Sequence, residues 1–315
     1  MTTDTTRRSA GFFSPATRWR NLAACFASVL FLSASAGHAA EYRLAPYKDE
    51  LFANPPPFKT LYAGHLEMVE YSSERYLDGR DEIPEKKAKA EYVSLDTQAS
   101  EQSLTMTDGR VRTFFAAAGD TEKPRAIVIF LHGRDADHKA GFSDWTFGGN
   151  FNRIKNLMVR NGGVYVSPSF SDFREGGKRQ IAGIIEALTR NAPKAPVFLA
   201  CASAASALCT ALVGDASIAP MIGGVLLLGS GMKDVEAAAR VYAGNGRRIP
   251  IFIGHGTKDP IVNWVRMELF LKEILASSPD YPIRFRLFVS GYHGTPMRMV
   301  DWREVINWML AQRAG

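Results

Sequence analysis

Cysteine is scarce in this sequence, which has only Cys25, Cys201 and Cys209 among 315 residues. There is no Cys-x-x-Cys spacing and no His-Glu-x-x-His segment, so the usual spacings of metal ligands are absent. We therefore expect no metal and no cofactor. Cys201 and Cys209 are interpreted as buried free thiols, because cysteine often packs as a small apolar residue. The alternative is one disulfide between a strand end and the second turn of the next helix.

An excess of charge of one sign is also missing. The formal net charge is +6, and half of it belongs to residues 1–39, which hold four arginines and one aspartate. The rest of the chain has no basic stripe with interleaved aromatic residues, so nucleic acid is not an expected partner. Hydrophobic residues make up 46% and charged residues 22%, which is typical of a soluble globular protein.

The apolar stretch near the N-terminus is too short to span a bilayer comfortably. Residues 22–35 form an uncharged run of 14, whereas a spanning helix needs about 20. Arginines precede the run and small residues follow it, with possible cleavage after Ala36 or Ala39. Residues 1–39 are therefore interpreted as a signal peptide, and the protein as periplasmic or secreted, without a stable membrane span after cleavage. An uncleaved anchor is the alternative.

The remaining chain is divided at about residue 90. Residues 40–90 contain Pro55-Pro56-Pro57, which oppose regular structure, and several aromatic residues, so we expect an N-terminal extension packed on the core. Residues 91–315 are expected to form one α/β domain, because apolar runs alternate with segments of helical periodicity. Asp108-Gly109 predicts an antiparallel hairpin between 103–106 and 111–115. Strands are predicted at 126–131, 163–166, 197–200, 224–228, 250–253 and 283–289. Helices are predicted at 150–160, 177–190, 204–213, 233–243, 261–276 and 301–312.

Such alternation predicts a mostly parallel sheet, and ligands of such sheets bind beyond the carboxyl ends of the strands. Ser203 follows one predicted strand, Asp259 follows a later one, and His293 follows the last. The order Ser, Asp, His, with each residue at a strand end, is the chain order of one kind of nucleophilic triad.

These motifs resemble the α/β-hydrolase superfamily over roughly residues 100–312. The resemblance rests on Leu131-His132-Gly133, on His255-Gly-Thr-Lys-Asp-Pro-Ile-Val262, and on Gly291-Tyr-His-Gly294 before a last helix with two tryptophans. It implies an α/β-hydrolase fold with helices on both faces of the sheet. The family's Gly-x-Ser-x-Gly turn is replaced here by Cys201-x-Ser203-x-Ala205, which we interpret as a variant nucleophile elbow with two other small residues.

The resemblance also implies roles for the residues at this site. Ser203 would attack a carbonyl carbon, His293 would take and return the proton, and Asp259 would orient the imidazole. The oxyanion would accept hydrogen bonds from the backbone N–H groups of Ala204 and Arg134.

Other interpretations of the same residues remain open. Ser203 could be an ordinary helix N-cap, and Cys201 could be the nucleophile if the turn were shifted by two residues. His132 and His255 are interpreted as structural parts of His-Gly turns. Asp135, Asp137 and His138 are interpreted as a solvated loop rather than a metal site.

The expected surroundings of the site are open and partly apolar. Residues 230–248 number only 19, enough for one helix but not for a cap domain. Trp145 and Tyr292 are candidates for a substrate pocket, although the aromatic residues at 142–147 could equally seat the following helix.

The function expected from the resemblance is a serine hydrolase for carboxylic esters, with a small-molecule or polymeric substrate. A peptidase or an acyltransferase could use the same acyl-serine, and a non-catalytic binding protein is the third interpretation.

Overall fold

The computed structural model describes residues 42–83, 87–109, 111–244 and 246–313. Residues from Tyr42 onward form one compact unit. The predicted signal peptide and Cys25 lie outside the described residues.

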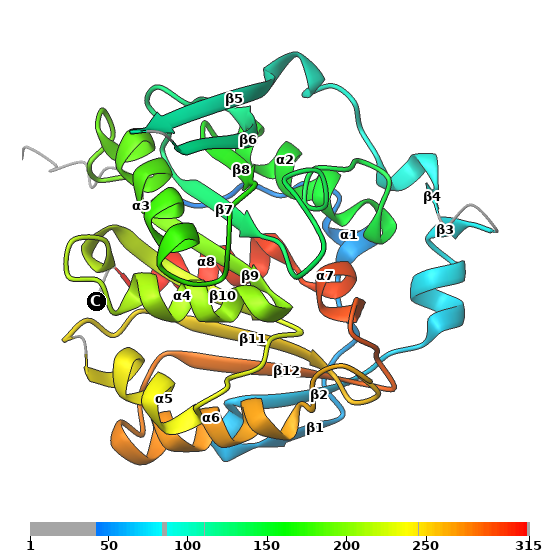
Figure 1. Ribbon diagram of the computed structural model, residues 1–315. Helices are drawn as coiled ribbons and strands as arrows, with labels where there is room; N and C mark the ends of the chain where they lie inside the picture. The colour runs from blue at the N-terminus through cyan, green and yellow to red at the C-terminus, as the bar shows by residue number, and fades with distance from the viewer. Residues whose placement is uncertain (1–41, 84–86, 110, 245, 314–315) are drawn as a thin grey trace, which may run out of the picture. The chain divides into compact units, whose positions relative to one another are not determined.

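The centre of this unit is a 10-stranded sheet, in the order β1-β2-β12-β11-β10-β9-β7-β8-β6-β5 (Figure 1). Its strands are β1 (Lys59–Leu61), β2 (Leu66–Glu70), β5 (Glu101–Asp108), β6 (Val111–Gly119), β7 (Ile127–Leu131), β8 (Val164–Pro168), β9 (Val197–Ala202), β10 (Ile222–Leu228), β11 (Ile251–Gly256) and β12 (Ile283–Val289). The pairs from β8 through β7, β9, β10, β11 and β12 to β2 are parallel. Antiparallel pairs lie at both edges, where β1 joins β2 and where β6 joins β8 and β5. The predicted parallel sheet and its antiparallel hairpin are confirmed.

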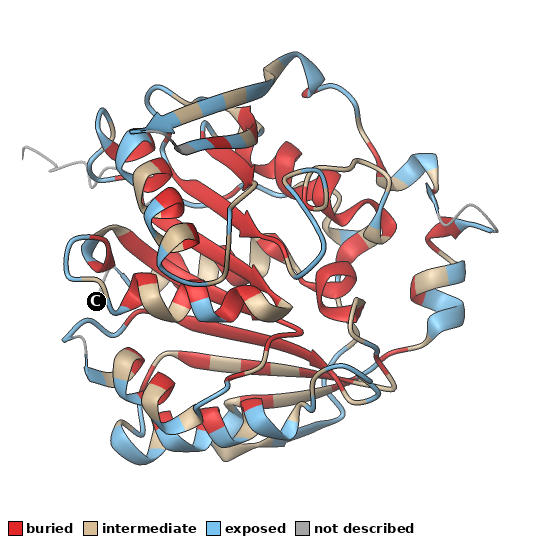
Figure 2. Ribbon diagram, viewed as in Figure 1, coloured by how far each residue is buried: buried red, intermediate tan, exposed pale blue. Residues whose placement is uncertain are grey.

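The helices cover the sheet on both faces. They are α1 (Asp49–Phe52), α2 (Asn150–Arg160), α3 (Glu175–Thr189), α4 (Ser206–Val213), α5 (Val235–Gly244), α6 (Val265–Ser277), α7 (Thr295–Met299) and α8 (Trp302–Ala311). Helices α3 to α6 contribute to one buried apolar cluster, and α2 and α8 to the cluster on the opposite face. Strands β7 to β11 are buried along their whole length (Figure 2), as expected for unbroken apolar runs between two helical layers.

Short elements complete the chain. They are the two-stranded sheet of β3 (Asp81–Glu82) and β4 (Lys87–Ala88), the π-helix η2 (Glu74–Asp78), and the 3-10 helices η1 (Tyr62–Gly64), η3 (Ala90–Tyr92), η4 (Gln98–Ser100), η5 (Phe147–Gly149), η6 (Ser203–Ala205) and η7 (Ala219–Met221). Between β10 and β11 the described chain forms only α5, and no cap domain covers the strand ends. Within the described ranges, no helix is both long enough and apolar enough to cross a membrane.

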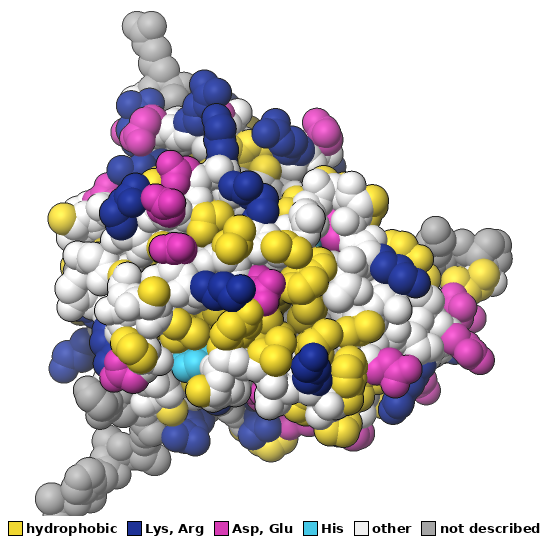
Figure 3. All heavy atoms as spheres, turned by 90° about the horizontal axis from the view of Figure 1, so that it is seen from below, with side chains coloured by type: hydrophobic (Ala, Val, Ile, Leu, Met, Phe, Trp, Pro, Cys, Tyr) yellow, Lys and Arg dark blue, Asp and Glu magenta, His cyan; other side chains and the backbone are white. Residues whose placement is uncertain are grey.

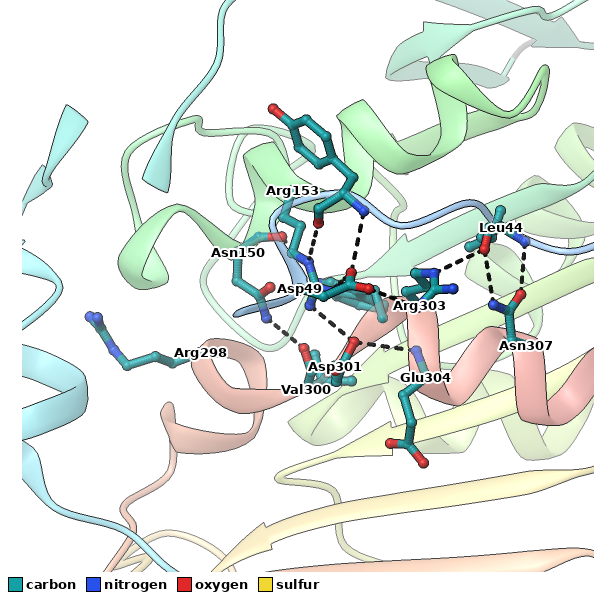
Figure 4. A network of polar contacts seen from close by, with 12 residues as sticks. Leu44, Asp49, Asn150, Arg153, Arg298, Val300, Asp301, Arg303, Glu304 and Asn307 are labelled. Atoms are coloured by element: carbon teal, nitrogen blue, oxygen red, sulfur yellow. Dashed lines mark hydrogen bonds and ion pairs between the residues drawn. The ribbon is translucent and has the colours of Figure 1, made fainter. Parts of the chain in front are cut away.

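The segment before residue 90 is built into the fold. Its strand β2 pairs with β12 and extends the central sheet. Its Asp49 carboxylate forms ion pairs with Arg153 on α2, at 3.0 Å, and with Arg303 on α8, at 2.7 Å (Figure 4). The Arg153 side chain is fully buried and also pairs with Asp301 at 3.0 Å. The segment therefore bridges two helices of one layer and continues the sheet.

The prediction of two free thiols is wrong, because Cys201 and Cys209 form a disulfide. Cys201 in β9 points toward the face that α4 covers, and both residues belong to the same buried cluster. Their Cα atoms lie 6.5 Å apart, within the range that a disulfide spans. The link closes an 8-residue separation, and Ser203 lies inside it.

Candidate active site

Ser203 lies at a sharp turn between a strand and a helix. Strand β9 ends at Ala202, and α4 begins at Ser206. The φ angle of Ser203 is 51°, in the left-handed region that side chains other than glycine rarely adopt. Such a turn lifts the serine hydroxyl above the strand end. Ala205 is fully buried at the position where a glycine is usual in this turn, so there is room for one methyl group.

The backbone after β7 passes directly against Ser203. A β-carbon built on Gly133 would lie 3.3 Å from Cβ of Ser203, tighter than most real contacts. A side chain at this position would require the turn at Ser203 to shift by a few tenths of an ångström. Arg134 and Ala204, whose backbone N–H groups are the predicted oxyanion donors, line the same cavity as Ser203.

Asp259 and His293 form the second half of the site. Nδ1 of His293 lies 2.7 Å from Oδ2 of Asp259. The Asp259 side chain is 1% exposed, and its Oδ1 accepts the N–H groups of Ile261 at 2.8 Å and Val262 at 3.0 Å. These backbone bonds hold the carboxylate in place, and the carboxylate in turn holds the His293 ring through Nδ1.

Glycines bring the loops of Asp259 and His293 together. A β-carbon on Gly256 would clash with the carbonyl of Gly291, and the N–H of Lys258 donates to that carbonyl at 2.8 Å. Gly229, at the end of β10, has φ of 58°, and a β-carbon there would lie 2.9 Å from the His293 carbonyl. Gly229 was not among the residues predicted from the sequence, although its place directly after a buried strand was a usable signal.

Two other histidines lie beside the site. His255 is buried, and its Nε2 lies 3.8 Å from Oδ2 of Asp259. Burial lowers the pKa of His255, so this ring is neutral near pH 7. His132 stacks on Phe170 at 4.2 Å between ring centroids, and burial lowers its pKa as well. Both rings pack beside the site, with Nδ1 of each directed at the carbonyl of the glycine that follows.

The strand ends open into a cavity of about 550 Å³ that holds both Ser203 and His293. Within the described chain no hydrogen bond joins these two side chains; such bonds often form only when substrate is bound. The apolar part of the cavity wall includes Phe130, Ala136, Phe147, Phe151, Ile261 and Met297.

One rim of the cavity is apolar and exposed. Ile261 lines the cavity and is 69% exposed, and Val265 and Leu269 continue the exposed apolar surface along α6. Figure 3 shows the face that includes α6, where hydrophobic side chains gather among scattered basic and acidic ones. The site therefore opens beside an apolar surface.

The two predicted pocket residues do not line this cavity. Nζ of Lys87 lies 4.0 Å from the centre of the Trp145 ring, and Tyr292 is about half exposed. Phe147 lines the cavity instead, and its ring packs edge-to-face on that of Phe151 on α2, with ring centroids 5.4 Å apart. Phe147 therefore forms the cavity wall and seats the helix at once.

The loop considered as a metal site has other partners. Nδ1 of His138 lies 2.8 Å from Oγ of Ser169, and Asp137 accepts the N–H of Lys139. Among the described residues, no three His, Cys, Asp or Glu side chains gather as metal ligands would.

Two solved structures with a similar fold are esterases. A thermostable esterase matches with a TM-score of 0.52 and 15% identity, over 68% of this chain and 63% of its own. An esterase of Pyrococcus furiosus matches with a TM-score of 0.50 and 13% identity, over 67% of this chain and 92% of its own. No protein-family model and no curated protein matches this sequence. This chain has the α/β-hydrolase fold.

Proposed function

We propose that this protein is a serine hydrolase that cleaves carboxylic esters through an acyl-Ser203 intermediate. The observation that carries the proposal is the Asp259–His293 pair, in which Oδ2 and Nδ1 lie 2.7 Å apart. His293 lines the same cavity as Ser203, and Ser203 lies at a sharp turn with a φ angle of 51°. The likeness in fold to two esterases supports the same chemistry.

In the proposed mechanism, Oγ of Ser203 attacks the ester carbonyl while Nε2 of His293 takes the hydroxyl proton. The backbone N–H groups of Ala204 and Arg134 stabilise the oxyanion, and each is worth on the order of 3 kcal/mol in the transition state. His293 then protonates the leaving alcohol. A water molecule, deprotonated by the same ring, releases the acid and restores Ser203.

We also propose that the protein is exported to the periplasm or secreted. The arginine-led apolar segment within residues 1–39 supports export. The Cys201–Cys209 disulfide supports it independently, because disulfides persist in oxidising compartments and are rare in the cytosol.

Steady-state hydrolysis of 4-nitrophenyl esters tests the proposed reaction. Ser203→Ala and His293→Ala should each lower kcat by at least about 10³-fold, since both act in the bond-making step. Ser277→Ala, an exposed serine on α6, is the matched control and should keep the wild-type rate.

A parallel series of 4-nitroanilides and a series with added alcohols decide the class of acceptor. Faster turnover of anilides would indicate a peptidase, and transfer to alcohol in preference to water would indicate an acyltransferase. Wild-type protein that hydrolyses no ester or amide would contradict the proposal and favour a binding function.

A further inference from the structure

A second cavity adjoins the one that Ser203 and His293 line. It has a volume of about 930 Å³ and shares Arg134, Ala204 and Gly231 with the first cavity. Because the cavities share these residues beside Ser203, a substrate whose carbonyl lies at Ser203 could extend from the first cavity into the second.

The second cavity differs from the first in its charges. Its wall includes the cationic side chains of Arg134, Arg174 and Lys233. Within the described residues, none of the three forms an ion pair with a carboxylate. Arg134 instead contacts the ring of Phe173 at 5.8 Å.

The carboxylates in the same wall are occupied by backbone groups. Asp172 accepts the N–H of Arg174 at 2.8 Å and that of Gly177 at 3.1 Å. These bonds, chiefly the one from Gly177, lower the pKa of Asp172. Asp234 accepts the N–H of Ala237 at 2.9 Å. Both carboxylates therefore cap helix N-termini, whereas the three cations are available to a ligand.

The first turn of α4 adds to the positive potential. Ser206 and Ala207 of this turn line the cavity, and the turn contains no acidic residue. A helix N-terminus carries a partial positive charge. The wall is also held in shape, because the guanidinium of Arg266 donates to the carbonyls of Met232 and Lys233 at 2.9 and 2.8 Å.

We propose that this second cavity is a subsite for an anionic group, such as a carboxylate, carried by one half of the ester. The apolar first cavity then takes the other half. The substrate class is an ester that joins an apolar group to an acidic one. This inference rests on the proposed hydrolase function and specifies its substrate.

Matched pairs of esters test the subsite. The first pair, 4-carboxyphenyl acetate and its methyl ester, places the charge on the alcohol half. The second pair, 4-nitrophenyl hemiglutarate and 4-nitrophenyl pentanoate, places it on the acyl half. After correction for spontaneous hydrolysis, kcat/KM of the anionic ester should exceed that of its neutral partner by about tenfold in at least one pair. The ratio should fall in 0.5 M salt, because the cations are exposed.

Variants connect the preference to the subsite. Arg174→Ala combined with Lys233→Ala should lower the anionic-to-neutral ratio at least fivefold, mainly through KM of the anionic ester. Arg179→Ala, an exposed arginine on α3 that does not line the cavity, should keep the wild-type ratio. Anionic esters that react no faster than neutral ones in both pairs, or an unchanged ratio in the double variant, would overturn the proposal.

Calorimetric titration of the Ser203→Ala protein with the same esters separates the two proposals. Tighter binding of the anionic member, lost in the background of the double variant, supports the subsite whether or not any ester is hydrolysed. Equal binding of both members overturns the subsite even if neutral esters are good substrates. Failure of the wild-type protein to hydrolyse any ester overturns the hydrolase proposal alone.

Discussion

Replacement of Cys201 and Cys209 by alanine removes the covalent link across the turn that holds Ser203. The link closes a separation of 8 residues. The chain-entropy relation for a loop of this length gives about 2.5 kcal/mol of stabilisation through the unfolded state. We expect the free energy of unfolding of the double variant to fall by about this amount.

The same change should affect catalysis. Ser203 has φ of 51°, a conformation that costs roughly 1–2 kcal/mol for a residue with a side chain. The disulfide lies across this turn and opposes its relaxation. If relaxation of the Ser203 turn raises the activation free energy by about 1.4 kcal/mol, kcat falls about tenfold. We expect this loss in kcat with KM nearly unchanged, because the cavity wall itself is intact.

Urea unfolding and ester kinetics measure the two effects. Wild-type protein treated with a phosphine reductant loses the disulfide but keeps both sulfur atoms. Its changes in unfolding free energy and in kcat therefore report the loss of the covalent link without any change in packing volume. Titration of the denatured, unreduced full chain should count one thiol, that of Cys25, against three after reduction. Three thiols before reduction, or a double variant as stable as the wild type, would refute the reasoning.

Four further changes have defined outcomes. Asp259→Asn should lower kcat about 10⁴-fold in an ester assay, since the amide favours the wrong imidazole tautomer. Gly229→Val should abolish ester turnover, because φ is positive at Gly229 and a β-carbon there would contact His293, the proposed general base; circular dichroism checks the fold. Burial lowers the pKa of His255, so this histidine binds a proton more tightly in the unfolded chain than in the folded one. The free energy of unfolding should therefore fall as the pH drops below about 6.5, and it should fall less steeply in His255→Gln. Urea unfolding at pH 5 to 8 measures both. Asp81→Asn removes the ion-pair partner of the buried Arg298 and should lower the free energy of unfolding by about 3 kcal/mol or more in urea. Asp96→Asn, which removes the partner of the exposed Arg160, should lower it by less than about 1 kcal/mol.

Much of the fold could be predicted because its signals are local. The runs that became β7, β9, β10 and β11 are unbroken apolar segments, and strands buried between two helical layers need such segments. The hairpin of β5 and β6 follows from Asp108-Gly109, where Gly109 has φ of 57°. Strand β2 was not predicted, since only Leu66 and Val69 of its five residues are buried.

The features that could not be predicted depend on contacts between distant residues. Asp81 and Arg298 are far apart in sequence, and the residues around each of them do not predict that the two form an ion pair. The disulfide depends on which face of β9 carries Cys201, which an apolar run on both faces does not reveal. Trp145 and Phe147 lie two residues apart in one segment, and the sequence does not show that Phe147, whose φ angle is 51°, lines the cavity whereas Trp145 does not.

The most direct test of the proposed nucleophile is reaction of the native protein with a fluorophosphonate, followed by peptide mass spectrometry. We predict a single adduct on Ser203 that is absent from Ser203→Ala and forms much more slowly in His293→Ala. An adduct on another residue, or no adduct on folded protein that still hydrolyses esters, would contradict the assignment of Ser203, Asp259 and His293 as the catalytic residues.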